Sequence, residues 1–255
     1  MSTAVQTRGP GAQAWLTLIV CEAKMVVRDT AGLVVPLLLP LLILVTSAQS
    51  AGDQVVADGL TVLEVYVLPL VLTMVLATIG IINMPSFLAY YRRAGILRRL
   101  SATPASPVMV LVAQVVVSVA QALVGLTLAL AVAFLGFGAQ RPVDLGAAVG
   151  VYLLAMTAMY AGGMIVAAVA PTPNSAVAIG LVTFFGLGAL GGMFGGRSSL
   201  PEPLAVLGEW LPFGASVEAL AAAWVGSPVE PAHLISLGVT TVAGVVTAAL
   251  FFRWD

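Results

Sequence analysis

The sequence predicts an all-α polytopic membrane protein with six transmembrane helices, and three observations carry this prediction. Hydrophobic residues make up 60% of the 255 residues and charged residues only 8%, whereas soluble domains contain about 25% charged residues. Apolar stretches of about 20 residues, the length that crosses a bilayer as a helix, recur along the chain. The basic residues gather in a few connections between these stretches. This composition excludes an ordinary soluble globular domain.

Residues 12–29 are expected to form an N-terminal interfacial helix. Polar side chains recur there at spacings of three and four residues, namely Gln13, Thr17, Cys21, Lys24 and Arg28. Such a stripe on an otherwise apolar helix is typical of a helix that lies in the membrane interface. The alternative is the irregular start of the first span. The interfacial helix is favoured because charged side chains are costly at mid-membrane depth.

Six spans are predicted from the apolar stretches, at residues 31–47, 60–84, 108–137, 145–170, 176–194 and 233–252. Pro36, Pro40 and Pro69 lie inside the first two spans, where kinks are expected. The third span is longer than a perpendicular crossing needs, so it should tilt or extend beyond the bilayer.

Between the fifth and sixth spans, residues 199–226 are predicted to form an outer re-entrant helical hairpin. Two apolar stretches of about 10 residues each are too short to cross the membrane. Pro212, Phe213 and Gly214 separate them, and Ser216 is the expected N-cap of the second helix. The connection between the fifth and sixth spans carries four glutamates, Glu202, Glu209, Glu218 and Glu230, which are expected on the outer face.

The basic residues predict the orientation of the spans. With six spans, most of them fall on one side of the membrane: Arg8, Lys24, Arg28, Arg92, Arg93, Arg98, Arg99 and Arg253. Only Arg141 and Arg197 fall on the other side. Cytoplasmic loops carry an excess of lysine and arginine, so both termini are expected to be cytoplasmic.

Residues 86–101 are predicted to form a short basic helix in the loop between the second and third spans. Arg92 and Arg99 would share one face of this helix, because they are seven residues apart. Tyr91, Ala94 and Leu97 would form a neighbouring apolar face. A helix of this kind can lie against a membrane or against a soluble partner.

Several residues of this loop resemble a known family. Gly95, the run Leu97-Arg98-Arg99-Leu100, and Ala102-Thr103-Pro104 followed by Ser106 are similar to the cytoplasmic loop of ABC type-2 transporter permeases. Within that family, the loop resembles that of the daunorubicin-resistance type of drug exporter membrane subunit. In that family an elbow helix precedes the first span and an outer hairpin precedes the last.

The resemblance implies one transmembrane permease domain over residues 1–255 and a bacterial plasma-membrane location. It implies that residues 86–101 are a cytoplasmic coupling helix that docks on a separate ABC ATP-binding subunit, through Arg92, Arg93, Gly95, Leu97, Arg98, Arg99 and Leu100. ATP and Mg would be bound by that partner. A second permease copy, membrane lipid and a hydrophobic or amphipathic substrate such as a drug, antibiotic or lipid are the other expected partners.

The chain is not expected to hydrolyse ATP itself. Its only lysine, Lys24, stands between alanine and methionine, so a phosphate-binding Gly-Lys-Ser/Thr loop cannot form. Its only histidine, His233, has no companions at metal-ligand spacing and is interpreted as an interfacial polar residue. We therefore expect no catalytic residue, no metal and no cofactor bound by this chain. A nucleic-acid partner is not expected either.

Gln114, Ser118 and Gln121 share one face of the third span. They either line a substrate path or form hydrogen bonds that pack this span against its neighbours, and packing is the favoured interpretation.

Gly188 and Gly192, with Gly196, are spaced four apart at the end of the fifth span. Two interpretations are open. The glycines form a groove that allows close dimer contact, or they loosen the helix end where the chain enters the next connection.

Glu64 supports an alternative function, a proton- or ion-coupled secondary transporter, because such a protein needs an ionisable residue inside a span. Its predicted position near the outer end of the second span instead favours an interfacial role. A third possibility is a membrane subunit that does not transport and only scaffolds other subunits.

Overall fold

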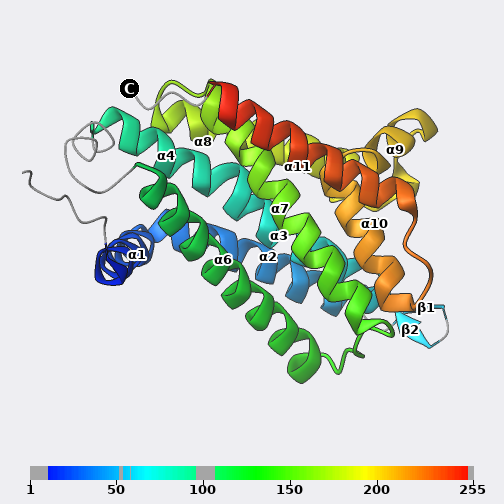
Figure 1. The fold of residues 1–255 in the computed structure, drawn as a ribbon. Coiled ribbons are helices and arrows are strands. Elements are labelled where there is room, and N and C mark those ends of the chain that lie inside the picture. Colours follow the sequence, from blue (N-terminus) through cyan, green and yellow to red (C-terminus); the bar gives the residue numbers. More distant parts are fainter. Residues whose placement is uncertain (1–10, 52–53, 58, 96–106, 252–255) are drawn as a thin grey trace, which may run out of the picture.

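The computed structural model describes residues 11–51, 54–57, 59–95 and 107–251. It is helical apart from one two-stranded hairpin (Figure 1). Six helical stretches are long and apolar enough to cross a membrane: Thr30–Ser50, Leu63–Arg93, Met109–Gly136, Leu145–Val169, Pro173–Leu190 and Pro231–Leu250. The predicted six-span, all-α fold is confirmed.

The helices are α1 (Ala12–Arg28), α2 (Thr30–Ala51), α3 (Leu68–Ala77), α4 (Met84–Arg93), α6 (Pro107–Ala131), α7 (Leu145–Val169), α8 (Pro173–Leu190), α9 (Glu202–Glu209), α10 (Pro212–Val225) and α11 (Pro231–Phe251). Three π-helical segments are η1 (Leu63–Val67), η2 (Thr78–Asn83) and η3 (Val132–Gly136). A 3-10 turn, η4, covers Arg197–Ser199. The strands β1 (Val55–Ala57) and β2 (Leu60–Thr61) pair in antiparallel fashion. The second span was expected to begin at residue 60, but residues 60–61 form β2 and the first helical segment of the span, η1, begins at Leu63.

The helix α1 turns away from the first span at Asp29, whose backbone is extended. Figure 1 shows α1 nearly end-on while the spans run across the picture. It packs on α6 and α2. A separate helix before the first span is therefore present, with bounds within one residue of the expected 12–29.

The second span is the centre of the bundle. The segments η1, α3, η2 and α4 follow one another without a break as one rod, and nearly all of its residues are buried. Each of η1 and η2 is followed by an α-helix with a proline near its start, Pro69 in α3 and Pro85 in α4. A proline cannot donate to the carbonyl four residues before it, and the wider π-turn absorbs this loss.

Close helix contacts around η2 depend on glycine. A Cβ atom on Gly163 of α7 would lie 1.9 Å from the carbonyl oxygen of Gly80, and one on Gly180 of α8 would lie 2.6 Å from that of Ile81. Small residues let backbones approach where no side chain fits between them. Because Gly163 and Gly180 have no side chain, α7 and α8 can pack directly against the backbone of the second span.

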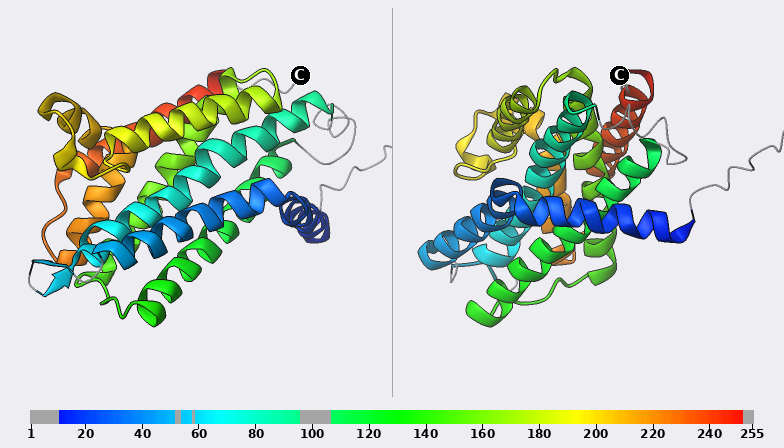
Figure 2. Two further views of the ribbon diagram at one scale, coloured as in Figure 1. Left: turned by 180° about the vertical axis from the view of Figure 1, so that it is seen from behind. Right: turned by 90° about the vertical axis from the view of Figure 1, so that its left-hand side faces the viewer.

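The bundle has two distinct ends, which Figures 1 and 2 show from three sides. At one end, called the loop end, lie α1, the end of α4, the start of α6 and the end of α11. At the other, called the hairpin end, lie β1, β2, α9 and the start of α11. The pair α9 and α10 is bent by 80° at residues 210–211 and does not form one straight span. The bent pair agrees with the expected hairpin before the last span.

Two local predictions were wrong. Ser216 does not cap α10, because the helix begins at Pro212 and the Ser216 hydroxyl donates to the Pro212 carbonyl at 2.7 Å. The helix expected at 86–101 does not exist as a separate element in its described part. Residues 86–93 are the last turns of α4, and Gly95 has a φ of +64°, a left-handed conformation that ends helices. Arg99 lies outside the described residues, so the face that it was expected to share with Arg92 stays a prediction.

Candidate functional site

The last turn of α4 is fixed to the end of α7 by Arg92. Its guanidinium donates to the carbonyl oxygens of Ala167, at 2.8 Å, and Ala170, at 2.7 Å. The last carbonyls of a helix have no partner within the helix, and they form the negative end of its dipole. A half-buried arginine thus caps α7 with charge-assisted hydrogen bonds.

The neighbouring Tyr91 fixes the same turn to α1. Its hydroxyl donates to the Glu22 carboxylate and lies 3.7 Å from the sulfur of Met25. Its ring packs with Val110 at the start of α6. Glu22 is only 5% exposed, and burial raises the pKa of its carboxyl group, an effect that the Tyr91 hydrogen bond partly offsets.

Together these contacts make a rigid platform from which the basic loop leaves the bundle. Arg93 is exposed at its edge, and Gly95 closes it with a left-handed turn. Leu97, Arg98, Arg99 and Leu100, the rest of the expected docking set, lie outside the described residues. The role of Arg92 in holding α7 was not foreseen, because its acceptors are about 75 residues away in sequence.

The polar face of the third span points into the bundle. Gln121 donates to the carbonyl oxygen of Gly32 in α2 at 2.8 Å, and Asn83 donates to the same oxygen. That carbonyl lacks its usual helix partner because Pro36, four residues on, has no N–H group. Side chains of two neighbouring spans supply the missing bond.

Gln114 and Ser118 are also buried, and the Oε1 atom of Gln114 has no hydrogen-bond partner within the described residues. Of the two interpretations of this face, the structure favours packing for Gln121. For Gln114 and Ser118, no hydrogen bond among the described residues decides between packing and a substrate path.

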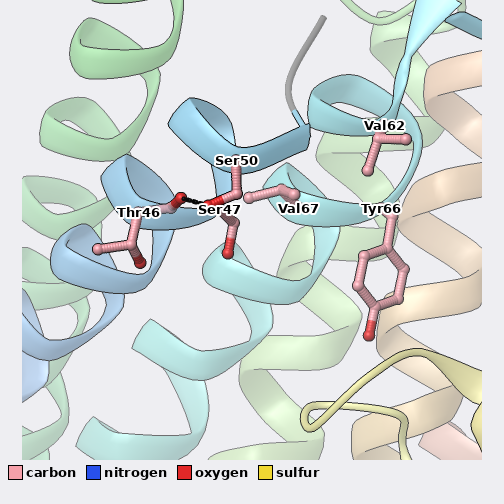
Figure 3. A pocket seen from close by; sticks show the side chains of 6 residues that line it. All are labelled: Thr46, Ser47, Ser50, Val62, Tyr66 and Val67. Carbon is pink, nitrogen blue, oxygen red and sulfur yellow. Dashed lines mark hydrogen bonds between the residues drawn. The ribbon is translucent and has the colours of Figure 1, made fainter. Parts of the chain in front are cut away.

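A groove with a volume of about 320 Å³ opens between α2 and the start of the second span at the hairpin end. Figure 3 shows its lining residues, which are Thr46, Ser47, Ser50, Val62, Tyr66 and Val67. The Thr46 and Ser50 hydroxyls donate to carbonyls of their own helix. Their oxygens remain able to accept a bond, so the groove combines an apolar wall with weak acceptors.

Tyr66 connects this groove to the segment after α8. Its hydroxyl donates to the carbonyl oxygen of Gly192. Gly192 has a φ of +85° and follows the end of α8 at Leu190. Gly188 is buried inside the helix against Met193. The three glycines therefore do not form one helical groove, and the positive φ values of Gly192 and Gly196 serve the turn instead.

Glu64 is held by local hydrogen bonds at the hairpin end. Its carboxylate accepts from the Thr61 backbone N–H at 2.6 Å, from the Thr61 hydroxyl, and from the Gln140 N–H at 2.9 Å. These bonds join the strand hairpin to the connection before α7. A carboxylate with such fixed partners is a structural clamp; its location at the membrane interface stays a prediction.

Within the described residues, no group of three or more His, Cys, Asp or Glu side chains is arranged to hold a metal ion.

Comparison with known proteins gives one family. Residues 13–224 match the family model described as ABC-2 type transporter. No curated protein matches the chain. The matched range runs from α1 to α10 and so includes the platform, the groove and the bent helix pair.

Proposed function

The chain belongs to the ABC-2 type transporter family, and from this we propose that it is the membrane subunit of an exporter of the daunorubicin-resistance type. ABC-2 permease domains are transport subunits without an ATPase domain, and they function with ABC ATPase subunits. In this proposal ATP and Mg bind to the partner subunit, and the present chain provides the path across the membrane.

The observation that carries the proposal, beyond the family, is the platform at the loop end. The basic loop leaves from a turn that is bonded to α7 through Arg92 and to α1 through Tyr91. A partner that pushes on the loop would therefore move α4, α1 and α7 together. The second span continues from α4 to the hairpin end as one rod, so the displacement would reach the groove near Tyr66 by rigid-body motion.

The proposed substrate is hydrophobic or amphipathic, such as a drug, an antibiotic or a lipid. The groove between α2 and the second span supports this class, because valine side chains and hydroxyl groups line it without a charged residue. A site for an inorganic ion would present charged or carbonyl ligands instead. In the proposal, the cytoplasmic location of both termini rests on the basic residues at the loop end, and export is the direction that the resemblance to drug exporters implies.

We propose further that two copies of the chain work together. Large apolar side chains are exposed on the outer faces of α2, α6, α8 and α11. Lipid covers most such faces in a membrane protein, and one of them would serve as the contact between copies.

The test is co-purification with the ABC ATPase subunit encoded beside this gene, followed by ATPase assays in proteoliposomes with and without the chain. Exchanging both Arg98 and Arg99 for glutamate should abolish association and the stimulation of ATP hydrolysis. Arg141→Glu is the matched control, since Arg141 is an exposed arginine in the connection before α7 at the opposite end.

Loss of association in the loop variant alone would support docking through the loop. Equal association of the loop variant and the native chain would contradict that docking mode. Absence of any association with the native chain would refute this partnership.

A further inference from the structure

The exposed side of α1 carries two parallel strips of different chemistry. Leu16, Val20 and Val27 form an apolar strip, and each of them is at least 49% exposed. Lys24 and Arg28, which are also exposed, form a basic strip beside it. At about 100° per residue around a helix, each strip covers a sector of only about 40°. The two strips therefore run next to each other along the same exposed side.

No exposed carboxylate on α1 offsets the charge of the basic strip. Glu22 is the only acidic residue of this helix, and it is buried on the opposite side, where it accepts the hydrogen bond from Tyr91. The Asp29 carboxylate, directly after the helix, lies against the first turn of α2. Lys24 and Arg28 have no ion pair within the described part of the chain. The basic strip thus holds two positive charges that an external anion can approach.

The orientation of α1 places both strips at the end of the spans. In Figure 1 the helix is seen nearly end-on while the spans run across the picture, and in the right-hand view of Figure 2 it extends sideways from the bundle. Its buried side packs on α6 and α2. In a membrane, a helix in this position would lie at the depth of the lipid headgroups. Apolar side chains there reach the acyl chains, and basic side chains reach the phosphates.

From this combination we propose that α1 binds anionic phospholipid. The side chains of the apolar strip contact the acyl chains, and Lys24 and Arg28 bind the headgroup of a lipid with net negative charge. A zwitterionic lipid satisfies the apolar strip equally well but leaves the two positive charges without a net counter-charge. The inference goes beyond the proposed transport function and does not depend on it, because it concerns only this chain and the bilayer.

The test measures which lipids surround α1 in the full chain. Cys21, the only cysteine, is exposed and lies on the same helix face as Arg28, seven residues before it. A fluorophore attached to Cys21 therefore reports the lipid near the basic strip. The labelled chain is reconstituted in nanodiscs of phosphatidylcholine with a minor fraction of phosphatidylglycerol. Separate samples carry a nitroxide quencher near the headgroup end of the acyl chain of one lipid or the other, and the two quenching values give the lipid ratio around α1.

We expect phosphatidylglycerol to be enriched around α1 by about tenfold or more over its fraction in the bilayer. Lys24→Gln and Arg28→Gln should each reduce this preference about fivefold, because a basic side chain near an anionic surface contributes about this factor to binding. The double variant Lys24→Arg with Arg28→Lys keeps both charges and should retain the preference. Arg141→Gln, at the hairpin end, controls for a general loss of positive charge and should also retain it.

Salt provides a test without any substitution. At about 1 M ionic strength the Debye length falls to about 3 Å, so the preference of the native chain should largely disappear. Equal quenching by the two lipids around the native chain at low salt would overturn the proposal. An undiminished preference in the double variant Lys24→Gln with Arg28→Gln would overturn it as well. Because no ATPase is present, these results are independent of the test of the transporter function.

Discussion

The side chain of Gln121 donates a hydrogen bond, 2.8 Å long, to the backbone carbonyl oxygen of Gly32 in the first span. The carbonyl is open to this bond because Pro36 interrupts the helix ladder. A proline in one span and a glutamine in another thus form a single structural unit, with Asn83 as a second donor.

Replacing Gln121 with leucine should destabilise the protein by about 1 kcal/mol, the usual size of a hydrogen bond between spans. Thermal unfolding in detergent measures the loss. Thr127→Val on the same helix is the control, because the Thr127 hydroxyl bonds only to the Leu123 carbonyl of its own helix. In a Pro36→Ala background the Gly32 carbonyl regains a helix partner, so Gln121→Leu should cost less there. An undiminished loss in that background would contradict the account of the open carbonyl.

Replacing Arg92 with methionine should separate the end of α4 from α7. The two bonds to Ala167 and Ala170 are lost, and bonds from charged donors contribute about 1.5–3 kcal/mol each when buried. Since Arg92 is only half-buried, we expect a total loss of about 2 kcal/mol. Arg93→Met, an exposed neighbour, should have little effect on thermal stability. Equal unfolding temperatures of the two variants would show that the Arg92 hydrogen bonds do not hold the end of α4 to α7.

Glu22 should make stability depend on pH. Burial raises the pKa of its carboxyl group in the folded protein above the value in the unfolded chain. The folded state then binds the proton more tightly than the unfolded state does. The stabilisation from this group is therefore fully present below its unfolded pKa of about 4.3. That contribution is lost as the pH rises through the folded pKa.

The matching experiment compares unfolding temperatures of the native chain and Glu22→Gln between acidic and neutral pH. The amide oxygen can still accept the hydrogen bond from the Tyr91 hydroxyl, and the amide has no charge to bury. We expect the variant to be the more stable of the two at neutral pH and to show a flatter pH profile. Parallel profiles would mean that Glu22 does not titrate in this range. Glu202→Gln, at an exposed position, should keep the native profile.

Gly163→Ala should disrupt the contact between α7 and the central rod. The new Cβ atom would fall 1.9 Å from the Gly80 carbonyl oxygen, and a backbone atom cannot move aside as a side chain end can. We expect a loss of at least about 3 kcal/mol, at the upper end of the range for overpacking. The neighbouring Gly162→Ala is a sharp control, because a Cβ atom there has nothing within 4 Å. It should be neutral or stabilising through helix propensity. Similar yields and unfolding temperatures of the two variants would show that the crossing can adapt.

Much of the fold was predictable from local sequence. The helix before the first span, the six candidate spans and the bent pair before the last span all follow from the lengths and polarity of the apolar stretches, because the bilayer imposes those lengths. The helix ends were less predictable. Span five was expected to reach residue 194, yet α8 stops at Leu190, because the run of glycines beyond it adopts positive φ values that hydropathy does not report.

Function at the level of the family was also within reach of the sequence, through Gly95 and the basic run after it. The expectation of one basic helix over 86–101 was wrong, because a pattern of charges does not determine where the helix of the second span ends. Gly95 ends α4, and Arg92 is turned inward to the carbonyls of α7.

The sequence by itself therefore determined the number of spans, the position of the basic loop and the absence of a phosphate-binding lysine motif. These depend on composition and short-range order. Only the tertiary structure decided what the polar residues do. It assigned Gln121 to a proline-freed carbonyl, Glu64 to a clamp on Thr61 and Gln140, and Arg92 to the end of α7. Each of these depends on which helices lie side by side, and the period of one helix carries no information about its neighbours.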